Sequence, residues 1–307
     1  MTTALITHKA CYDHVTPPGH PEQVARLDAV LGALEGLDLE PVTAPMAAED
    51  DLLRCHTQTH LNNIRDAAPT EGWRSLDADT HMSVGTLEAA YRAAGGLMKA
   101  VDMVMAGDVQ NAFSTMRPPG HHAERETPMG FCFFGNVAVA AKHAVEFHGL
   151  KRVAIVDFDV HHGNGTQDLV EEDARILFVS SHQMPLWPGT GAAHETGVGN
   201  VMNVPLPEGC GSALFRKTYE RDVFPRIAAF KPELLLISAG FDAHADDPLA
   251  GLNWQDDDFA WVTEQLCDLA DEHCQGRVVS ALEGGYDLEA LGRSARAHVE
   301  VLKERGA

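Results

Sequence analysis

The 307-residue chain is poor in basic residues: 23 Lys and Arg stand against 45 Asp and Glu, and the formal net charge is −22. Nucleic acids are bound through basic patches, so this composition argues against direct contact with DNA or RNA. The charge is compatible with a cationic substrate or partner, which the field of the protein would attract, and also with plain solubility.

Two kinds of segment are also missing. No apolar run approaches the length of a membrane span, and the apolar stretch near the N-terminus is too short for a signal peptide. We therefore expect a cytoplasmic protein that does not associate with membranes. The sequence has no low-complexity block and no repeat period that would indicate a solenoid.

The cysteines form no C-x-x-C pair; the six lie at Cys11, Cys55, Cys132, Cys210, Cys267 and Cys274. Their spacing fits neither a zinc ribbon nor the disulfide framework of a small secreted protein. We expect reduced thiols in or near the core.

Short apolar runs alternate with segments of helical periodicity along most of the chain. The pattern predicts strands at residues 4–7, 112–116, 153–158, 176–180, 234–238 and 278–282. It predicts helices at residues 84–105, 136–147, 213–230, 256–272 and 288–303. This alternation indicates an α/β fold with one mainly parallel sheet and helices on both faces. Since no segment resembles a linker, we expect a single domain over residues 1–307.

Polar residues and glycines follow four of the predicted strands. The strand at 153–158 runs into VAIVDFDVHHGNGT, where Asp157, Asp159 and His161 are spaced by two and project to one side of an extended backbone. The other three strands lead into RPPGHH, SAGFD and EGGY, which end at residues 122, 242 and 286. Ligands bind at the carboxyl ends of parallel strands, so we expect these segments to form one site.

The sequence offers a metal-ligand set of one nitrogen and two oxygens, from Asp159, His161 and Asp242. A catalytic zinc ion keeps three protein ligands and leaves a position for water and substrate. A lone D-x-H pair more often caps a turn or binds backbone, but a second aspartate at another strand end strengthens the metal interpretation.

His121 and His122 stand side by side after a Pro-Pro-Gly turn. They are either two polar loop residues or a general base and a general acid that work near neutral pH. As orienting partners we expect Asp157 and Asn164. A carboxylate partner raises the basicity of an imidazole more than an amide does, so the two histidines need not be equivalent.

Three aromatic residues complete the candidate site. Tyr286 follows two glycines and would donate a hydrogen bond to a developing oxyanion, although it could also be a packed aromatic. Phe131 and Trp187 lie in loops that contain Gly or Pro. Taken alone, each is more typical of a core residue. Together they would form the walls of an apolar slot for an aliphatic chain.

These residues fall within six ordered motifs that resemble those of the zinc-dependent histone deacetylase family. The motifs are RPPGHHA, GFC, DFDVHHGNGT, WPGTG, GFDAH and EGGY, which begin at residues 117, 130, 157, 187, 240 and 283; GHPE at 19–22 also fits. The Pro-Pro-Gly-His-His form and Asn164 resemble the class II branch and its bacterial relatives, the histone deacetylase-like and acetylpolyamine amidohydrolases.

The resemblance implies the arginase/deacetylase fold and one zinc ion per chain, held by Asp159, His161 and Asp242. It places Tyr286 at the scissile carbonyl. It also implies a structural potassium ion near the zinc, which would involve Ser180, Asp157 and the backbone at the first two zinc ligands.

The same resemblance assigns His121 and His122 to proton transfer, with Asp157 behind the first and Asn164 behind the second. His162 would be a structural residue or a support for the ligands rather than an additional ligand.

For the substrate, the resemblance implies a tunnel for the acyl-lysine side chain. Phe131, Trp187, Gly130 and Gly284 would line this tunnel. Asp79, in the segment LDADT, would match the rim carboxylate that holds the substrate backbone in the family.

Two positions bear on the choice of substrate. Polyamine-selective eukaryotic relatives carry a glutamate just after the Asp-Pro that follows the zinc aspartate, and this chain has Leu249 there. It also keeps Tyr286, which a poorly active branch replaces with His. Because of Tyr286 we expect an active deacetylase. Leu249 favours N-acetyl-lysine in a peptide or protein as the substrate, and so does a chain too short for the extra dimerisation loop of bacterial acetylpolyamine hydrolases.

Two alternatives remain at this stage. One is an amidohydrolase of acetylpolyamines or other small N-acetylated amines, and the other is a catalytically silent metal-containing binding protein. A homo-oligomer is compatible with either.

Overall fold

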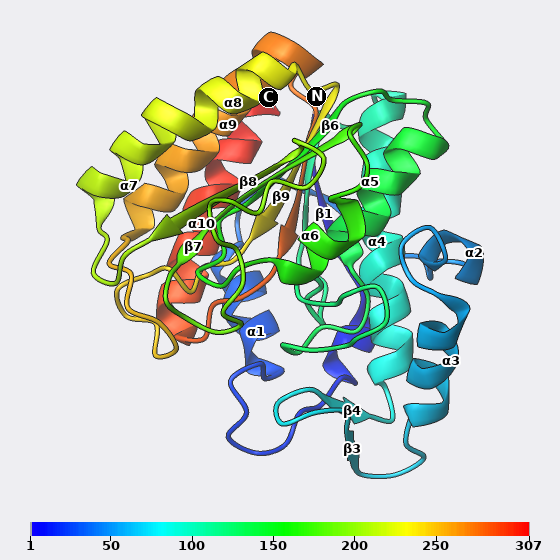
Figure 1. Cartoon of the computed structure of the whole chain (residues 1–307). Helices are drawn as coiled ribbons and strands as arrows, with labels where there is room; N and C mark the ends of the chain where they lie inside the picture. The colour runs from blue at the N-terminus through cyan, green and yellow to red at the C-terminus, as the bar shows by residue number, and fades with distance from the viewer. Residues whose placement is uncertain (1, 307) are drawn as a thin grey trace.

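The computed structural model describes residues 2–306, whose centre is an eight-stranded sheet (Figure 1). The strands are β1 (Thr3–Thr7), β2 (Glu40–Thr43), β5 (Asn111–Ser114), β6 (Val153–Asp157), β7 (Ile176–Gln183), β8 (Val201–Leu206), β9 (Leu234–Ala239) and β10 (Val278–Leu282). Their order is β2-β1-β5-β10-β9-β6-β7-β8, and every neighbouring pair is parallel. A separate antiparallel hairpin joins β3 (Trp73–Ser75) to β4 (His81–Ser83).

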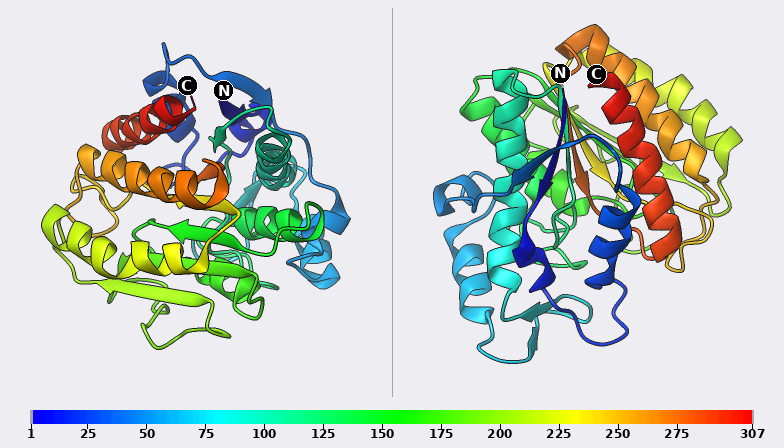
Figure 2. Two further views of the ribbon diagram at one scale, coloured as in Figure 1. Left: turned by 90° about the horizontal axis from the view of Figure 1, so that it is seen from above. Right: turned by 180° about the vertical axis from the view of Figure 1, so that it is seen from behind.

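Helices cover both faces of the sheet, as Figure 2 shows from above and from behind. One layer consists of α4 (Thr86–Ala106), α5 (Asn136–Glu146) and α6 (Asn164–Val170), with α2 (Glu49–Leu52) and α3 (Gln58–Ala67) outside them. The other consists of α1 (Ala25–Ala33), α7 (Ser212–Thr218), α8 (Phe224–Phe230), α9 (Asp256–Cys274) and α10 (Leu288–Arg305). Each layer buries its own apolar cluster against one face of the sheet, which is why the central strands are apolar on both sides. The predicted α/β architecture is confirmed.

The sequence pattern predicted the central strands of the sheet correctly but did not predict the edge strands. β2 is largely exposed and β8 contains Pro205, so neither shows the continuous apolar run of a buried strand. The helices α1, α2, α3 and α6 and the turn η1 (Lys9–Tyr12) were not predicted either. The helix predicted at 213–230 is continuous in the structure, but a π-helical turn, η2 (Tyr219–Val223), separates α7 from α8.

The order of the central strands brings the motif-bearing loops together. β5, β10, β9 and β6 are consecutive in the sheet, so the segments after their carboxyl ends are neighbours. In the strand register Asp157 lies beside Ser238 on one side and Ser180 on the other. Distant parts of the chain therefore meet at one edge of the sheet.

All six cysteines are free and buried among the described residues, as expected. Over residues 2–306, no helix has both the length and the apolar character that crossing a membrane requires.

Candidate active site and metal centre

Asp159, His161 and Asp242 converge at the carboxyl ends of β6 and β9. One ligand atom from each residue lies within 4.8 Å of the others. His161 Nδ1 is 3.2 Å from Asp159 Oδ1 and 3.1 Å from Asp242 Oδ2. Ligands at about 2.0 Å from a tetrahedral zinc ion lie roughly 3.3 Å apart, so the donor atoms are already close to the spacing of a zinc site.

Backbone groups fix both carboxylates in place. Asp159 accepts hydrogen bonds from the N–H of His161 at 2.9 Å and of Gly284 at 2.8 Å, and Asp242 accepts one from the N–H of Val160 at 2.9 Å. Gly284 packs directly against both carboxylates, and an added Cβ at this position would collide with their oxygens. Glycine is required there for close approach to the cluster.

The electrostatics of the cluster call for a positive charge. Burial and the neighbouring Asp159 raise the pKa of Asp242 to about 7. Burial lowers the pKa of His161, but its hydrogen bonds to Asp159 and Asp242 outweigh this and raise it to about 10. Two buried carboxylates thus hold a proton on the imidazole between them. A divalent cation would supply the same compensation, so the donor set fits a metal ion.

The paired histidines lie beside this cluster with their rings 3.9 Å apart. His121 Nδ1 lies 3.0 Å from Asp157 Oδ2, and His122 Nδ1 lies 2.8 Å from Asn164 Oδ1. The Asn164 amide donates to Glu124 at 2.8 Å, which directs its oxygen towards the imidazole. The structure therefore brings each histidine together with the partner expected from the sequence.

The two imidazoles are not equivalent. Burial lowers the pKa of His121, but the carboxylates of Asp159 and Asp157 raise it well above its usual value. The pKa of His122 is held well below its usual value by burial and by the positive charges of His121 and His161. The pKa values of the two neighbouring imidazoles are thus shifted in opposite directions.

Glu283 is a residue of this site that the sequence reasoning did not single out. Its fully buried carboxylate accepts hydrogen bonds from the N–H groups of Gly120 at 2.7 Å and His121 at 3.2 Å, and from the Ser238 hydroxyl at 3.1 Å. Burial raises its pKa to about 7. Glu283 thus connects the ends of three strands through its hydrogen bonds. In the sequence, only its position directly before Gly-Gly-Tyr could have indicated this role.

Tyr286 faces the cluster from the end of β10. Its backbone N–H donates to Asp247 at 2.7 Å, and the Arg26 guanidinium lies 5.1 Å from the centre of its ring. Burial and the nearby Asp242 raise the pKa of the Tyr286 hydroxyl well above its usual value, so it keeps its proton and can donate it in a hydrogen bond.

A cavity of about 360 Å³ leads to these groups. Its wall is formed by His20, Pro21, Ala78, Asp79, His81, His122, Gly130, Phe131, His161, Leu186, Trp187, Leu249 and Tyr286. The Phe131 and Tyr286 rings meet edge to face at 5.9 Å, and Trp187 meets His122 in the same way at 4.7 Å. The cavity is thus lined by aromatic side chains together with the His161 and His122 imidazoles and the Tyr286 phenol.

Gly130 has a specific reason to be glycine. Its φ is +55°, and an added Cβ would lie 2.5 Å from the His122 ring and 2.6 Å from the Trp187 ring. By contrast Gly284, also expected in the tunnel wall, lies beneath the metal-ligand carboxylates and is not among the cavity-lining residues.

The rim of the cavity contains Asp79 and Leu249. His20 Nε2 donates to the Asp79 carbonyl oxygen at 2.8 Å, which ties the GHPE segment to the turn of the β3–β4 hairpin. Burial and Asp77 raise the pKa of the Asp79 carboxyl. His20 and His81 were not predicted as site residues. The GHPE motif could have indicated His20, and no motif indicated His81.

Two further predicted residues lie behind the cluster. Ser180 is adjacent to Asp157 across β6 and β7, and its hydroxyl bonds His182 Nδ1 at 3.0 Å. His162 turns away from the metal ligands and bonds Thr190 at 2.8 Å and Gln167 at 3.0 Å.

Comparison with known proteins agrees with this geometry. A family profile described as the histone deacetylase domain matches residues 20–302. The chain belongs to the histone deacetylase family. The chain is 40% identical over 285 residues to a histone deacetylase-like amidohydrolase of Pseudomonas aeruginosa, an alignment that covers 89% of this chain and 74% of the relative. It is a hydrolytic deacetylase.

Two further comparisons place this deacetylase in the family. It is 41% identical over 299 residues to a rice protein named histone deacetylase 10, chloroplastic, covering 90% of this chain and 68% of the relative. The crystal structure of the HDA15 HD domain superposes with a TM-score of 0.94 at 34% identity, covering 99% of this chain and 89% of that one. The deacetylase therefore has the arginase/deacetylase fold.

Proposed function

We propose that this deacetylase is a zinc-dependent hydrolase of N-acetyl-lysine in peptides or proteins, with residues 1–307 as one catalytic domain. One observation carries the proposal: the cavity that admits a slender apolar chain ends at His161, His122 and Tyr286 together. Asp159, His161 and Asp242 would hold the zinc ion. When bound, zinc polarises the amide carbonyl and lowers the pKa of water.

In this proposal His122 moves the proton. It lines the cavity, and its Nδ1 donates to the Asn164 amide oxygen, which leaves Nε2 as the ring nitrogen that can accept a proton from the attacking water. The same imidazole then donates the proton to the leaving amine nitrogen. His121, which Asp157 keeps protonated, supplies positive charge beside this step, and Asn164 orients the His122 ring.

Tyr286 would donate its hydroxyl proton in a hydrogen bond to the substrate oxygen as negative charge develops there. Phe131 and Trp187 would hold the four-carbon stem of lysine between their rings, and Gly130 leaves room for it. Asp79 at the rim would accept hydrogen bonds from the substrate backbone.

A potassium ion near Asp157 and Ser180 is a further part of the proposal; the two residues are neighbours in the strand register. We also propose that the enzyme acts in the cytoplasm. Because the rice relative is named chloroplastic, fractionation of cells that express the chain is the appropriate check.

A substrate panel on zinc-reconstituted protein tests the proposal. We expect release of acetate from an acetyl-lysine peptide to exceed release from longer acyl-lysine peptides and from acetylputrescine, and to disappear on chelation. Release from none of these substrates by the zinc-loaded protein would contradict the assignment.

The same panel separates lysine from polyamine substrates. A preference for acetylputrescine would replace the lysine assignment with the small-amine alternative. Leu249→Glu places a carboxylate at the cavity rim and should shift the preference towards the cationic acetylputrescine. His194→Gln, at an exposed histidine away from the cavity, is the matched control and should leave the preference unchanged.

A further inference from the structure

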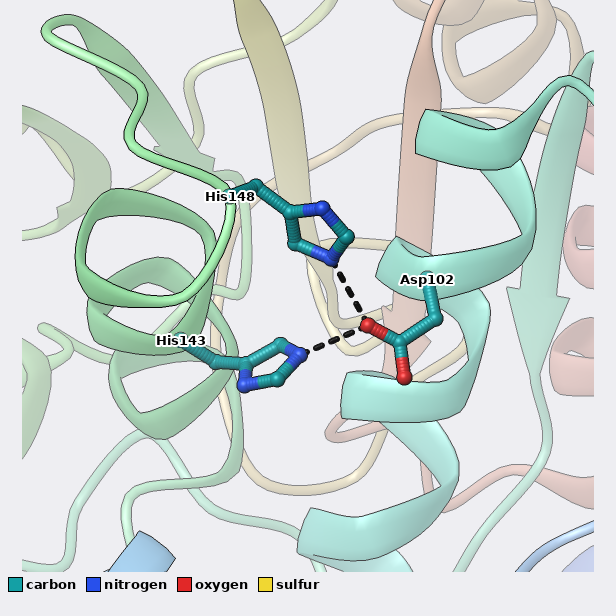
Figure 3. A group of neighbouring side chains, drawn as sticks. All are labelled: Asp102, His143 and His148. Carbon is teal, nitrogen blue, oxygen red and sulfur yellow. Dashed lines mark hydrogen bonds and ion pairs between the residues drawn. The ribbon is translucent and has the colours of Figure 1, made fainter.

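A second group of metal-binding residue types lies between α4 and α5, and the catalytic proposal does not use it. Asp102 comes from α4, His143 from α5, and His148 from the segment just after α5 (Figure 3). One donor atom from each lies within 4.8 Å of the others. We name these residues the peripheral cluster.

The peripheral cluster and the catalytic residues lie at opposite ends of the sheet. His148 precedes the first residue of β6, and Asp102 lies in the last turns of α4, before β5 begins. The peripheral cluster is thus near the amino ends of these strands, whereas the catalytic residues follow their carboxyl ends. A ligand at one cluster would not contact the other.

Both imidazoles aim at the same carboxylate oxygen. Nε2 of His143 and Nε2 of His148 each lie 2.7 Å from Asp102 Oδ1. The second oxygen of Asp102 points away from both rings (Figure 3). Two imidazole nitrogens and one carboxylate oxygen form a donor set preferred by borderline transition metals such as zinc. Here they come from α4, α5 and the segment just after α5.

The imidazoles are held in this orientation before any metal binds. His143 is buried, and its ring stacks on Phe147 at 4.9 Å with an interplanar angle of 12°. Phe147 also meets the His148 ring edge to face at 5.1 Å. The Asp102 side chain is 39% exposed, so an ion can reach the cluster from solvent, and the net charge of −22 favours cations near the surface.

We propose that Asp102, His143 and His148 bind a second zinc ion, separate from the catalytic centre, that connects α4 to the end of α5. The 2.7 Å separations must widen by roughly half an ångström to reach zinc spacing, which the half-exposed Asp102 side chain can provide by rotating. His143 Nδ1 is buried without a partner among the described residues. The site therefore lacks the supporting hydrogen bond that strengthens metal-binding histidines, and the second ion binds more weakly than the first.

Metal stoichiometry tests the proposal without reference to activity. The full chain is stripped with a chelator, dialysed against a zinc buffer and analysed for bound zinc by mass spectrometry. We expect two equivalents in the unmodified protein and one in His148→Gln and in Asp102→Asn. His194→Gln should keep two, and all variants should show the circular dichroism of the unmodified protein.

A cobalt titration gives an independent readout of the same site. The unmodified protein should show two successive phases in the visible absorption of Co²⁺, and His148→Gln should lose the second. Equal zinc content in the unmodified protein and both cluster variants would overturn the proposal. So would a single phase that is identical in the unmodified protein and His148→Gln.

Discussion

Within residues 2–306, two clusters of Asp and His have donor atoms close enough for a metal ion, and they differ in how their carboxylates are supported. In the cluster proposed to be catalytic, Asp159, His161 and Asp242 (the catalytic cluster), main-chain N–H groups hold both carboxylates, and His161 Nδ1 lies 3.1 to 3.2 Å from them. In the peripheral cluster, Asp102 is held by two imidazoles at 2.7 Å and is partly open to solvent. Because the two clusters share residue types but differ in support and spacing, we expect their metal affinities to differ. The His161 imidazole also bonds both carboxylates of the catalytic cluster, but the backbone N–H groups keep these atoms close to zinc spacing. In the peripheral cluster the two imidazoles must move apart from Asp102 before an ion fits.

The largest expected effect is the loss of activity when the catalytic cluster loses its metal. Because a bound metal ion contributes several kcal/mol of charge stabilisation, chelation should lower kcat/KM by about a thousandfold or more. Added zinc should restore the rate. His148→Gln, measured in parallel, should lose and regain activity to the same extent; undiminished hydrolysis after complete removal of metal would contradict the catalytic role of the cluster.

The second largest effect is expected from Tyr286. The peripheral cluster, which consists of Asp102, His143 and His148, includes no tyrosine. Tyr286→Phe removes one donor to the developing oxyanion and should lower kcat by around two to three orders of magnitude, with KM little changed. Steady-state kinetics on an acetyl-lysine peptide measures both constants. Turnover close to that of the unmodified enzyme would rule out this role for the hydroxyl.

A smaller effect is expected at the amide that orients His122. Asn164→Ala removes the acceptor 2.8 Å from His122 Nδ1 and should lower kcat roughly 10- to 100-fold, as is usual for residues that orient a functional imidazole. Asn63→Ala, at an exposed position of α3, is the matched control and should have no effect. Equal rates for the two variants would show that Asn164 does not position the imidazole.

The peripheral cluster is expected to affect stability rather than rate. With free zinc at 100 times its dissociation constant there, the second ion should stabilise the fold by about 2.7 kcal/mol. This corresponds to a rise of about 5 °C in Tm, which His148→Gln should lack. Thermal unfolding of both proteins over a range of zinc concentrations measures the difference, while their kcat values should agree within about twofold. A variant that gained the full increment would contradict the assignment.

The smallest effect is a dependence on pH in the metal-free protein. Burial raises the pKa of Asp102, but the hydrogen bonds with His143 and His148 outweigh this and lower it below its usual value. A carboxyl whose folded pKa is depressed contributes stability above its unfolded pKa of about 3.9 and loses it as the pH falls through the folded pKa. Because the group is partly exposed, the contribution is less than about 1 kcal/mol. The difference in unfolding free energy between the unmodified protein and Asp102→Asn should shrink as the pH falls below about 4; a difference that grew in acid would contradict this sign.

The sequence allowed prediction of those parts of the molecule whose signal is local. Buried parallel strands are apolar throughout, and polar residues begin directly where each strand ends. The ends of β5, β6, β9 and β10 could therefore be found, and the segments that follow them could be expected to form one site. The edge strands β2 and β8 have no such pattern because one side of each is open. Glu283 was missed because its partners, two backbone N–H groups and the Ser238 hydroxyl, leave no sequence motif beyond its place before Gly-Gly-Tyr.

The peripheral cluster could not be predicted for a different reason. Asp102 lies on one helix, and His143 and His148 span the end of another, so their proximity depends on how α4 packs against α5. Both helices were predicted from the sequence, at residues 84–105 and 136–147, but none of these three residues was singled out. Contacts between helices depend on packing angle and register, which periodicity does not specify.

Helix α5 connects the turn before the paired histidines to the peripheral cluster. Its first residue, Asn136, donates to the Pro118 carbonyl in the turn that carries the paired histidines, and seven residues later it presents His143 to the peripheral cluster. At the rise of an α-helix these two positions are roughly 10 Å apart along a rigid axis. A paramagnetic ion at the peripheral cluster would therefore broaden the nuclear magnetic resonances of a ligand in the catalytic cavity by an amount fixed by distance. The orientation of a bound substrate could be measured in solution without altering any residue that contacts it.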